Sequence, residues 1–83
     1  MTGKQAIARA RQHAVKPYTI FDTLMEADDY FVVSFRDEEN SEPAGGMTPL
    51  LFCVSKKTGF ARAMFPPNPE DLAILNKAEE VEP

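Results

Sequence analysis

Side chains with strong chemical reactivity are few in this sequence, which has one histidine, His13, and one cysteine, Cys53. Nucleophilic catalysis needs a nucleophile, a base and usually a third group that orients the base. A Cys53–His13 pair could supply the nucleophile and the base. Catalysis by this pair is one hypothesis for the function, although no motif surrounds the two residues. Zinc sites need several cysteine or histidine ligands at suitable spacing, and two such residues cannot form a typical one. We therefore expect no catalytic residues, no metal and no cofactor.

Acidic side chains are densest between two apolar segments. Asp37, Glu38, Glu39 and Glu42 stand in a stretch from 37 to 49 that also contains two prolines and two glycines. This stretch lacks the ligand spacing and the central glycine of an EF-hand calcium loop. We expect a flexible surface loop, because connections of this length are usually functional or mobile.

The composition is typical of one small globular domain: 83 residues, of which 43% are hydrophobic and 27% are charged. The net charge of -4 is unevenly distributed. Residues 1–16 hold four basic side chains and no acidic one, which leaves 5 basic against 13 acidic, or -8, for the rest. An acidic body disfavours nucleic acid as a partner and suits a basic protein surface. The alternative interpretation is solvated charge that serves solubility.

Targeting signals are not visible in the sequence. No apolar run approaches the roughly 18 residues of a membrane span, and the basic N-terminus is not followed by an apolar segment of signal-peptide length. A single cysteine fits a reducing compartment. We expect a cytoplasmic protein with no membrane partner.

The hydrophobic pattern predicts an α+β fold with an N-terminal helix, a three- to four-stranded antiparallel meander sheet and a C-terminal helix. Residues 1–83 form one small domain in this prediction, with a flexible loop at 37–49 and a frayed acidic tail at 80–83. Thr2 and Gln5 form a capping-box pattern, and Lys56-Lys57-Thr58-Gly59 predicts a hairpin turn. Leu72, Leu75 and Ala78 are the expected buried face of the last helix. The expected elements are a helix over 3–15, strands over 18–25, 30–35, 50–54 and 60–65, and a helix that begins at Asn68.

The second expected strand has two apolar faces, because strand side chains alternate. Phe31, Val33 and Phe35 point one way, and Tyr30 and Val32 point the other. If both helices pack on one face, the other exposes an apolar stripe that could contact a partner or a second copy. If one helix covers each face, no such stripe exists. The sequence leaves both arrangements open.

Two segments carry a family resemblance: the strand Tyr30-Phe-Val-Val-Ser-Phe35, and Pro49-Leu-Leu-Phe-Cys-Val-Ser-Lys-Lys-Thr-Gly59 after the long polar loop. With a helix before them and the acidic helix start Pro66-Pro-Asn-Pro-Glu-Asp71 after them, they resemble the YrhB-like immunity protein family (immunity protein 35). The resemblance implies a non-enzymatic cytoplasmic protein that binds and neutralises a toxin. It carries over no residue-level site.

These observations favour a small protein-binding domain without enzymatic activity, of immunity or inhibitor type. The alternative is an accessory protein of a phage or mobile element that acts as a homodimer through its sheet. The expected partner-binding residues are Asp37, Glu38, Glu39, Glu42, Tyr30 and Val32.

Overall fold

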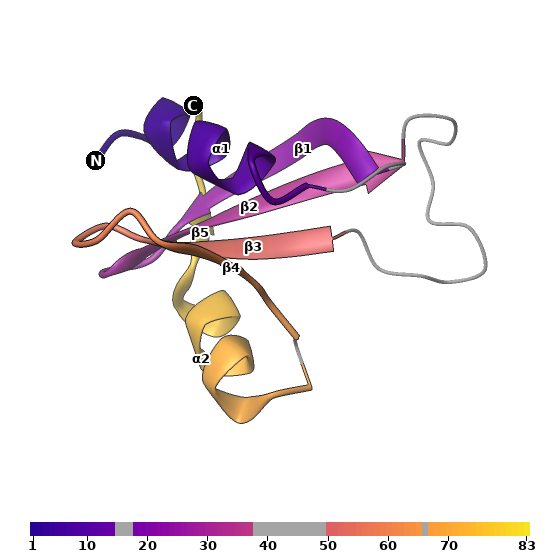
Figure 1. Ribbon diagram of the computed structural model, residues 1–83. Coiled ribbons are helices and arrows are strands. Elements are labelled where there is room, and N and C mark those ends of the chain that lie inside the picture. The colour runs from indigo at the N-terminus through magenta and orange to yellow at the C-terminus, as the bar shows by residue number, and fades with distance from the viewer. Residues whose placement is uncertain (15–17, 38–49, 66) are drawn as a thin grey trace.

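The computed structural model describes residues 1–14, 18–37, 50–65 and 67–83. Two helices lie on opposite sides of an antiparallel sheet (Figure 1), so the predicted α+β class is confirmed. Five strands are hydrogen-bonded in the order β4-β3-β2-β1-β5. In chain order the elements are α1 (Gly3–Arg11), β1 (Tyr18–Glu26), β2 (Tyr30–Asp37), β3 (Leu50–Ser55), β4 (Ala61–Ala63), α2 (Pro69–Lys77) and β5 (Glu79–Glu80).

Helix α1 begins with the predicted capping box. The Thr2 N–H donates to Gln5 Oε1 at 2.8 Å, and the Gln5 N–H donates to Thr2 Oγ1 at 3.2 Å. The helix ends at Arg11 rather than near residue 15, because the N–H groups of His13 and Ala14 bond the carbonyls three residues earlier and tighten the chain out of α-helical geometry.

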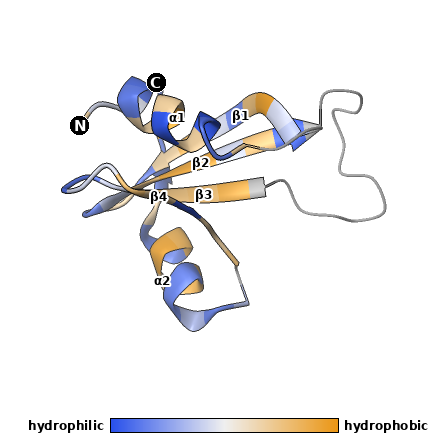
Figure 2. Ribbon diagram, in the orientation of Figure 1, coloured by the Kyte–Doolittle hydropathy of each residue, from blue (hydrophilic) through white to orange (hydrophobic). Residues whose placement is uncertain are grey.

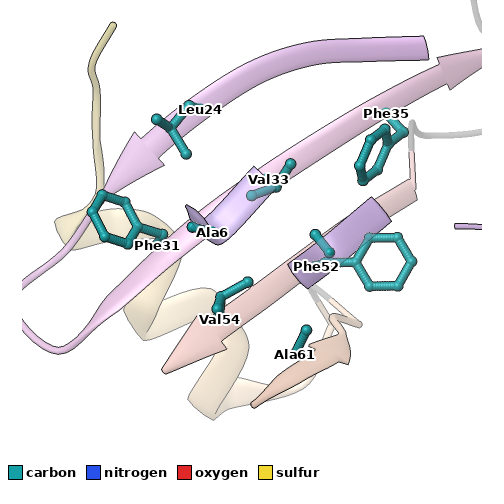
Figure 3. Packing of buried hydrophobic residues seen from close by; sticks show 9 residues of the cluster. Ala6, Leu24, Phe31, Val33, Phe35, Phe52, Val54 and Ala61 are labelled. Atoms are coloured by element: carbon teal, nitrogen blue, oxygen red, sulfur yellow. The ribbon is translucent and has the colours of Figure 1, made fainter. Parts of the chain in front are cut away.

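The side of the sheet under α1 holds the larger core. Ala6 and Ala10 of the helix are completely buried, and their small size lets the helix lie close to the strands. Figure 3 shows Ala6 among side chains from β1, β2, β3 and β4. Phe35 and Phe52 meet edge to face there, with ring centroids 5.8 Å apart, a favoured aromatic geometry. The buried members of this core are Ala6, Ala10, Leu24, Phe31, Val33, Phe35, Phe52, Val54 and Ala61.

Helix α2 covers the other side of the sheet. Val32, Cys53 and Met64 are buried there, and Ile74 and Leu75 of α2 pack against them. One helix therefore covers each face, which decides between the two arrangements that the sequence left open. Figure 2 shows the hydrophobic residues gathered on the strands between the helices.

The buried side of α2 differs from the prediction. Asn68 caps the helix as expected, with Oδ1 accepting from the Glu70 N–H at 3.0 Å. Leu72, however, is 47% exposed, whereas Asp71 is 2% exposed. The expectation for Leu72 is wrong because the first turn of α2 is anchored through Asp71, which turns Leu72 outward.

The chain after α2 also differs from the prediction of a frayed tail. Glu79 and Glu80 pair with Glu26 and Met25 of β1 as the fifth strand. The Val81 N–H donates to the Leu24 carbonyl at 2.9 Å, and Val81 packs against the core under α1. The tail thus crosses the β1 edge of the sheet, from the α2 side to the α1 side.

The turn between β3 and β4 has the predicted chemistry. Gly59 adopts a φ of 73°, which glycine tolerates without steric cost. Its N–H donates to the Ser55 carbonyl at 2.8 Å, and Thr58 Oγ1 accepts from the Phe60 N–H at 3.1 Å. The return strand is shorter than predicted, at Ala61–Ala63 rather than 60–65.

Candidate functional site

The two residues of the catalytic hypothesis lie on opposite sides of the sheet. Cys53 is 1% exposed in the core under α2, and burial raises the pKa of its thiol. His13 is exposed on the α1 side, with its ring centroid 6.5 Å from that of Phe52. Because Cys53 and Phe52 are neighbours in one strand, they point to opposite faces. The structure therefore does not bring Cys53 and His13 together.

Of the residues expected to bind a partner, Asp37, Tyr30 and Val32 lie in the described part of the chain. Glu38, Glu39 and Glu42 lie outside the described residues. Asp37 is the last residue of β2, where its backbone pairs with Tyr18.

The expected second sheet face is not exposed. Val32 is completely buried, and Tyr30 is partly buried in the core under α2. The prediction of a stripe at Tyr30 and Val32 that is open to a partner or a second copy is therefore wrong. Contact through Val32 would require α2 to leave the sheet.

The two edges of the sheet differ in how they are protected. At one edge, β5 is two residues long and both are exposed glutamates. β1 beside it departs from regular pairing twice, between Tyr18 and Ile20 and between Phe21 and Thr23. Short edge strands, charges and bulges all discourage pairing with another chain.

The opposite edge, β4, is also short, at three residues, but it has no bulge and its one charge, Arg62, is paired with Asp71. Ala61, Arg62 and Ala63 pair with β3 in regular register, and two of the three side chains are small and uncharged. Phe60 and Phe65 flank the strand, and each is 66% exposed. We define the β4 edge surface as the exposed side chains of Phe60, Ala63 and Phe65 together with the backbone of Ala61, whose side chain is buried. Exposed apolar side chains beside a strand edge that no further strand covers are typical of a protein contact site.

The direction of the backbone N–H and C=O groups of β4 also supports a contact site at this edge. The Ser55 N–H donates to the Phe60 carbonyl at 3.0 Å, and the Met64 N–H donates to the Leu51 carbonyl at 2.8 Å. Residues of an antiparallel strand alternate between bonding one neighbour and facing the other side. Phe60, Arg62 and Met64 therefore bond β3, and the backbone groups of Ala61 and Ala63 point out from the sheet edge.

An ion pair holds the C-terminal end of β4 to helix α2. Arg62 Nη2 lies 2.7 Å from Asp71 Oδ1, and the Phe65 N–H donates to Asp71 Oδ2 at 2.8 Å. The hydrogen bond from Arg62, followed by the one from the Phe65 backbone, holds the pKa of Asp71 below its usual value. The same pairing raises the pKa of Arg62. Asp71 thus joins α2 to β4 and neutralises the only charge on the strand.

A shallow hollow of about 330 Å³ lies at the N-terminal end of β4, between the end of α1 and the hairpin turn. Arg9 and His13 line it from the helix, and Thr58 and Phe60 line it from the turn. Arg9 forms no ion pair with any part of the chain that the structure describes. Arginine beside an exposed aromatic ring is a common composition of binding hot spots.

Sequence reasoning did not find this surface. The sequence predicts the strand that contains Phe60 and Phe65, but it does not show that this strand is at an edge. One signal was available in the sequence. The alternation of side chains around Ala61 and Ala63 leaves Phe60 and Phe65 without a further strand to cover them.

Within the described ranges, no three histidine, cysteine, aspartate or glutamate side chains are grouped so that they could hold a metal ion. The helices in those ranges are too short and too polar to cross a membrane.

Comparison with protein-family models, with curated proteins and with solved structures found no match. The function must therefore be argued from the surface of the molecule itself.

Proposed function

We propose that this chain is a small protein-binding domain without enzymatic activity, of immunity or inhibitor type, which neutralises a partner protein by binding it. The observation that carries the proposal is the β4 edge surface. Two phenylalanines that are each two-thirds exposed flank the last strand of the sheet. Burying a phenylalanine side chain contributes roughly 1.5 to 3 kcal/mol, so leaving two of them in water in so small a domain favours a role in contact.

The hollow beside Phe60 supports the same role. Its Arg9 and His13 could meet an acidic group of the partner, while the ring of Phe60 supplies apolar area at the centre of the contact. The acidic residues Asp37, Glu38, Glu39 and Glu42 stay in the proposal as a second contact region, which would suit basic groups on the partner.

The immunity role in this proposal is based on the resemblance to YrhB-like immunity proteins. Such a protein would reside in the cytoplasm beside the toxin that it blocks. The unpaired thiol of Cys53 fits a reducing compartment.

The β4 edge also favours the alternative function, an accessory protein of a phage or mobile element that works as a homodimer through its sheet. The contact would then be made at the sheet edge, because α2 covers the face on which Val32 lies.

The immunity function predicts that the gene beside that of this chain encodes the toxin. Growth of cells that express this adjacent gene with and without the chain tests that function. We expect the adjacent gene alone to arrest growth and the unaltered chain to restore it. A Phe60→Glu, Phe65→Glu double variant should fail, because it places charges where an apolar contact is required. Ile20→Glu is the matched control, since Ile20 is also exposed but lies on the far edge of the sheet.

Two results would contradict the proposal. One is an adjacent gene product that does not harm cells lacking this chain. The other is full protection by the double variant, which would show that Phe60 and Phe65 do not contact the partner.

A further inference from the structure

Basic side chains lie beside the β4 edge in a chain that is acidic elsewhere. Residues 1–16 hold four basic side chains and no acidic one, and the other 5 basic and 13 acidic side chains give -8 for the rest. Helix α1, which this basic segment forms, contacts β4. The basic part of the protein is therefore next to the strand that ends the sheet.

Two side chains of the basic segment follow β4 from its start to its end. A β-carbon at Gly59 would lie 3.6 Å from Arg9 Nε, so Arg9 lies over the turn that leads into the strand. His13 lies further along, because its ring is 6.5 Å from that of Phe52, and Phe52 pairs with Ala63. Both side chains are on the α1 side of the sheet.

We propose that the partner adds an extended, acidic segment to β4 as a further strand, with carboxylates at alternate positions that face Arg9 and His13. This inference rests on the proposed function and specifies which part of the partner the β4 edge receives. Addition of a strand to an exposed sheet edge is a recurring mode of peptide recognition. Backbone hydrogen bonds supply the affinity, and alternate side chains supply the specificity.

The backbone of Ala61 and Ala63 offers the hydrogen bonds that such a strand needs. The bonds of Phe60 and Met64 to β3 leave the N–H and C=O groups of the two alanines pointing out from the edge. In antiparallel pairing, each alanine exchanges both bonds with one opposing residue. The described strand pairs of this sheet are all antiparallel. The added segment therefore runs opposite to β4, with its C-terminal end beside the hairpin turn.

Side-chain alternation determines which positions of the segment are acidic. Residues directly opposite each other in a sheet point to the same face, and Ala61 points into the core under α1. The residues opposite Ala61 and Ala63 therefore have their side chains on the α1 side. The hollow that Arg9, His13 and Ala61 line can receive a carboxylate there, and none of its described lining residues is acidic.

Other parts of the described surface suit an acidic strand less well. At the opposite edge Glu79 and Glu80 are exposed, so a carboxylate would meet like charge. On the α2 side of β4, Arg62 is already paired with Asp71 at 2.7 Å. Arg9 has no ion pair within the described ranges and is available to a carboxylate of the partner. Net charge alone suggests a basic partner, because it does not show where the basic side chains lie.

Titration of the isotopically labelled full chain with two short synthetic peptides, followed by amide NMR spectra, tests the inference. One peptide alternates valine with glutamate, and the other alternates valine with lysine. We expect the glutamate peptide to bind with a dissociation constant of about 1 mM or lower. At saturation it should slow the exchange of the Ala61 and Ala63 amides at least about tenfold. The lysine peptide should bind at least about tenfold more weakly.

Charge reversal in the hollow should exchange the two preferences. An Arg9→Glu, His13→Glu double variant should bind the glutamate peptide at least about tenfold more weakly and should favour the lysine peptide. Arg11→Glu is the matched control, because Arg11 is also exposed in the last turn of α1 but does not line the hollow. It should change the affinity for the glutamate peptide by less than about threefold.

A backbone variant tests strand addition separately from charge. Ala63→Pro should weaken binding of the glutamate peptide at least about tenfold, because it removes an outward N–H donor. The ladder to β3 does not use that donor, so the chain should stay folded. Ala63→Ser keeps the N–H and should bind the peptide nearly as well as the unaltered chain.

Three results would overturn the inference. The first is a glutamate peptide that leaves the Ala61 and Ala63 amides unchanged at concentrations of about 10 mM. The second is peptide binding that is indifferent to Ala63→Pro or to the charge reversal. The third is protection of the two amides by self-association alone, with no further change on adding peptide, which would assign the edge to a second copy.

These outcomes are distinguishable from failure of the proposed function. A chain that does not bind the glutamate peptide but still needs Phe60 and Phe65 to protect cells would retain the proposed function and lose the acidic strand. A chain that binds the peptide as expected, beside an adjacent gene product that is harmless, would retain the acidic-strand site and lose the immunity role.

Discussion

An Asp71→Asn variant should lose about 1.5 to 3 kcal/mol of unfolding free energy at pH 7, the usual contribution of a hydrogen bond to a charged group. Asparagine has the same shape and can still accept from the Phe65 N–H. It loses the charge that pairs with Arg62 at 2.7 Å. Arg62 is partly exposed, so water can solvate it in the variant, which keeps the loss below that of a fully buried pair. Thermal or urea unfolding measures the difference.

The loss should depend on pH in a defined direction. The pKa of Asp71 is lowered in the folded state, so the pair stabilises the fold above the unfolded pKa of about 3.9. That stabilisation disappears as the pH falls through the lower folded pKa. The stabilities of the unaltered chain and of Asp71→Asn should therefore begin to converge as the pH falls below about 4 and become equal only below the folded pKa of Asp71.

Glu70→Gln is the matched control for this experiment. It removes a charge from the adjacent residue in the same helical turn, but Glu70 is exposed, so we expect a loss of only a few tenths of a kcal/mol. If Asp71→Asn were no less stable than this control, or if its deficit were the same at pH 3 and pH 7, Asp71 would not anchor α2.

The thiol of Cys53 should react with a small disulfide reagent at least about a thousandfold more slowly in the folded protein than in the unfolded chain. It is 1% exposed under α2, and burial raises its pKa, so little thiolate is present. Reaction then requires local opening, whose rate follows the free energy of opening. A cysteine placed on the surface by Lys57→Cys, in a Cys53→Ala background, is the control and should react at the rate of an unfolded chain.

Asp71→Asn connects the two predictions. If Asp71 holds α2 on the sheet, this variant should speed the labelling of Cys53 by about tenfold or more, since 1.4 kcal/mol corresponds to a factor of ten. Fast labelling of Cys53 in the unaltered chain would show that α2 does not cover the second face. It would also reopen contact through Val32.

Local patterns in the sequence were sufficient to predict most of the elements. Thr2 and Gln5 predict the start of α1, Gly59 predicts the hairpin turn, and Asn68 with Pro69 predicts the start of α2. Each of these signals acts over a few residues and has one dominant physical cause, a cap or a backbone angle. The antiparallel pairing of β1 with β2 and of β3 with β4 followed because short turns join the strands of each pair.

Features that depend on residues distant in the sequence were not predictable in this way. Leu72 looks like a core residue by spacing, but the Arg62–Asp71 pair rotates it outward. Glu80 has the sequence of a solvated tail, but the packing of Val81 against the core brings Glu80 into strand β5. Neither outcome can be derived without knowing which strand lies beside α2.

The candidate site was missed for the same reason. Tyr30 and Val32 were chosen because their strand has two apolar faces, and only the position of α2 shows that both faces are covered. Phe60 and Phe65 become notable only when β4 is seen to be the last strand of the sheet. A single sequence shows which residues form a strand, but strand order comes from tertiary packing.

Amide hydrogen exchange of the isotopically labelled chain, measured free and in complex, tests most directly whether the β4 edge binds protein. The complex can be that with the neutralised partner or with a second copy. We expect the exchange of the Ala61 and Ala63 amides to slow by at least about tenfold on binding, because their N–H groups gain partners, while the amides of β1 are unchanged. Unchanged exchange at Ala61 and Ala63, with new protection confined to residues 38–49 or to β1, would contradict this assignment.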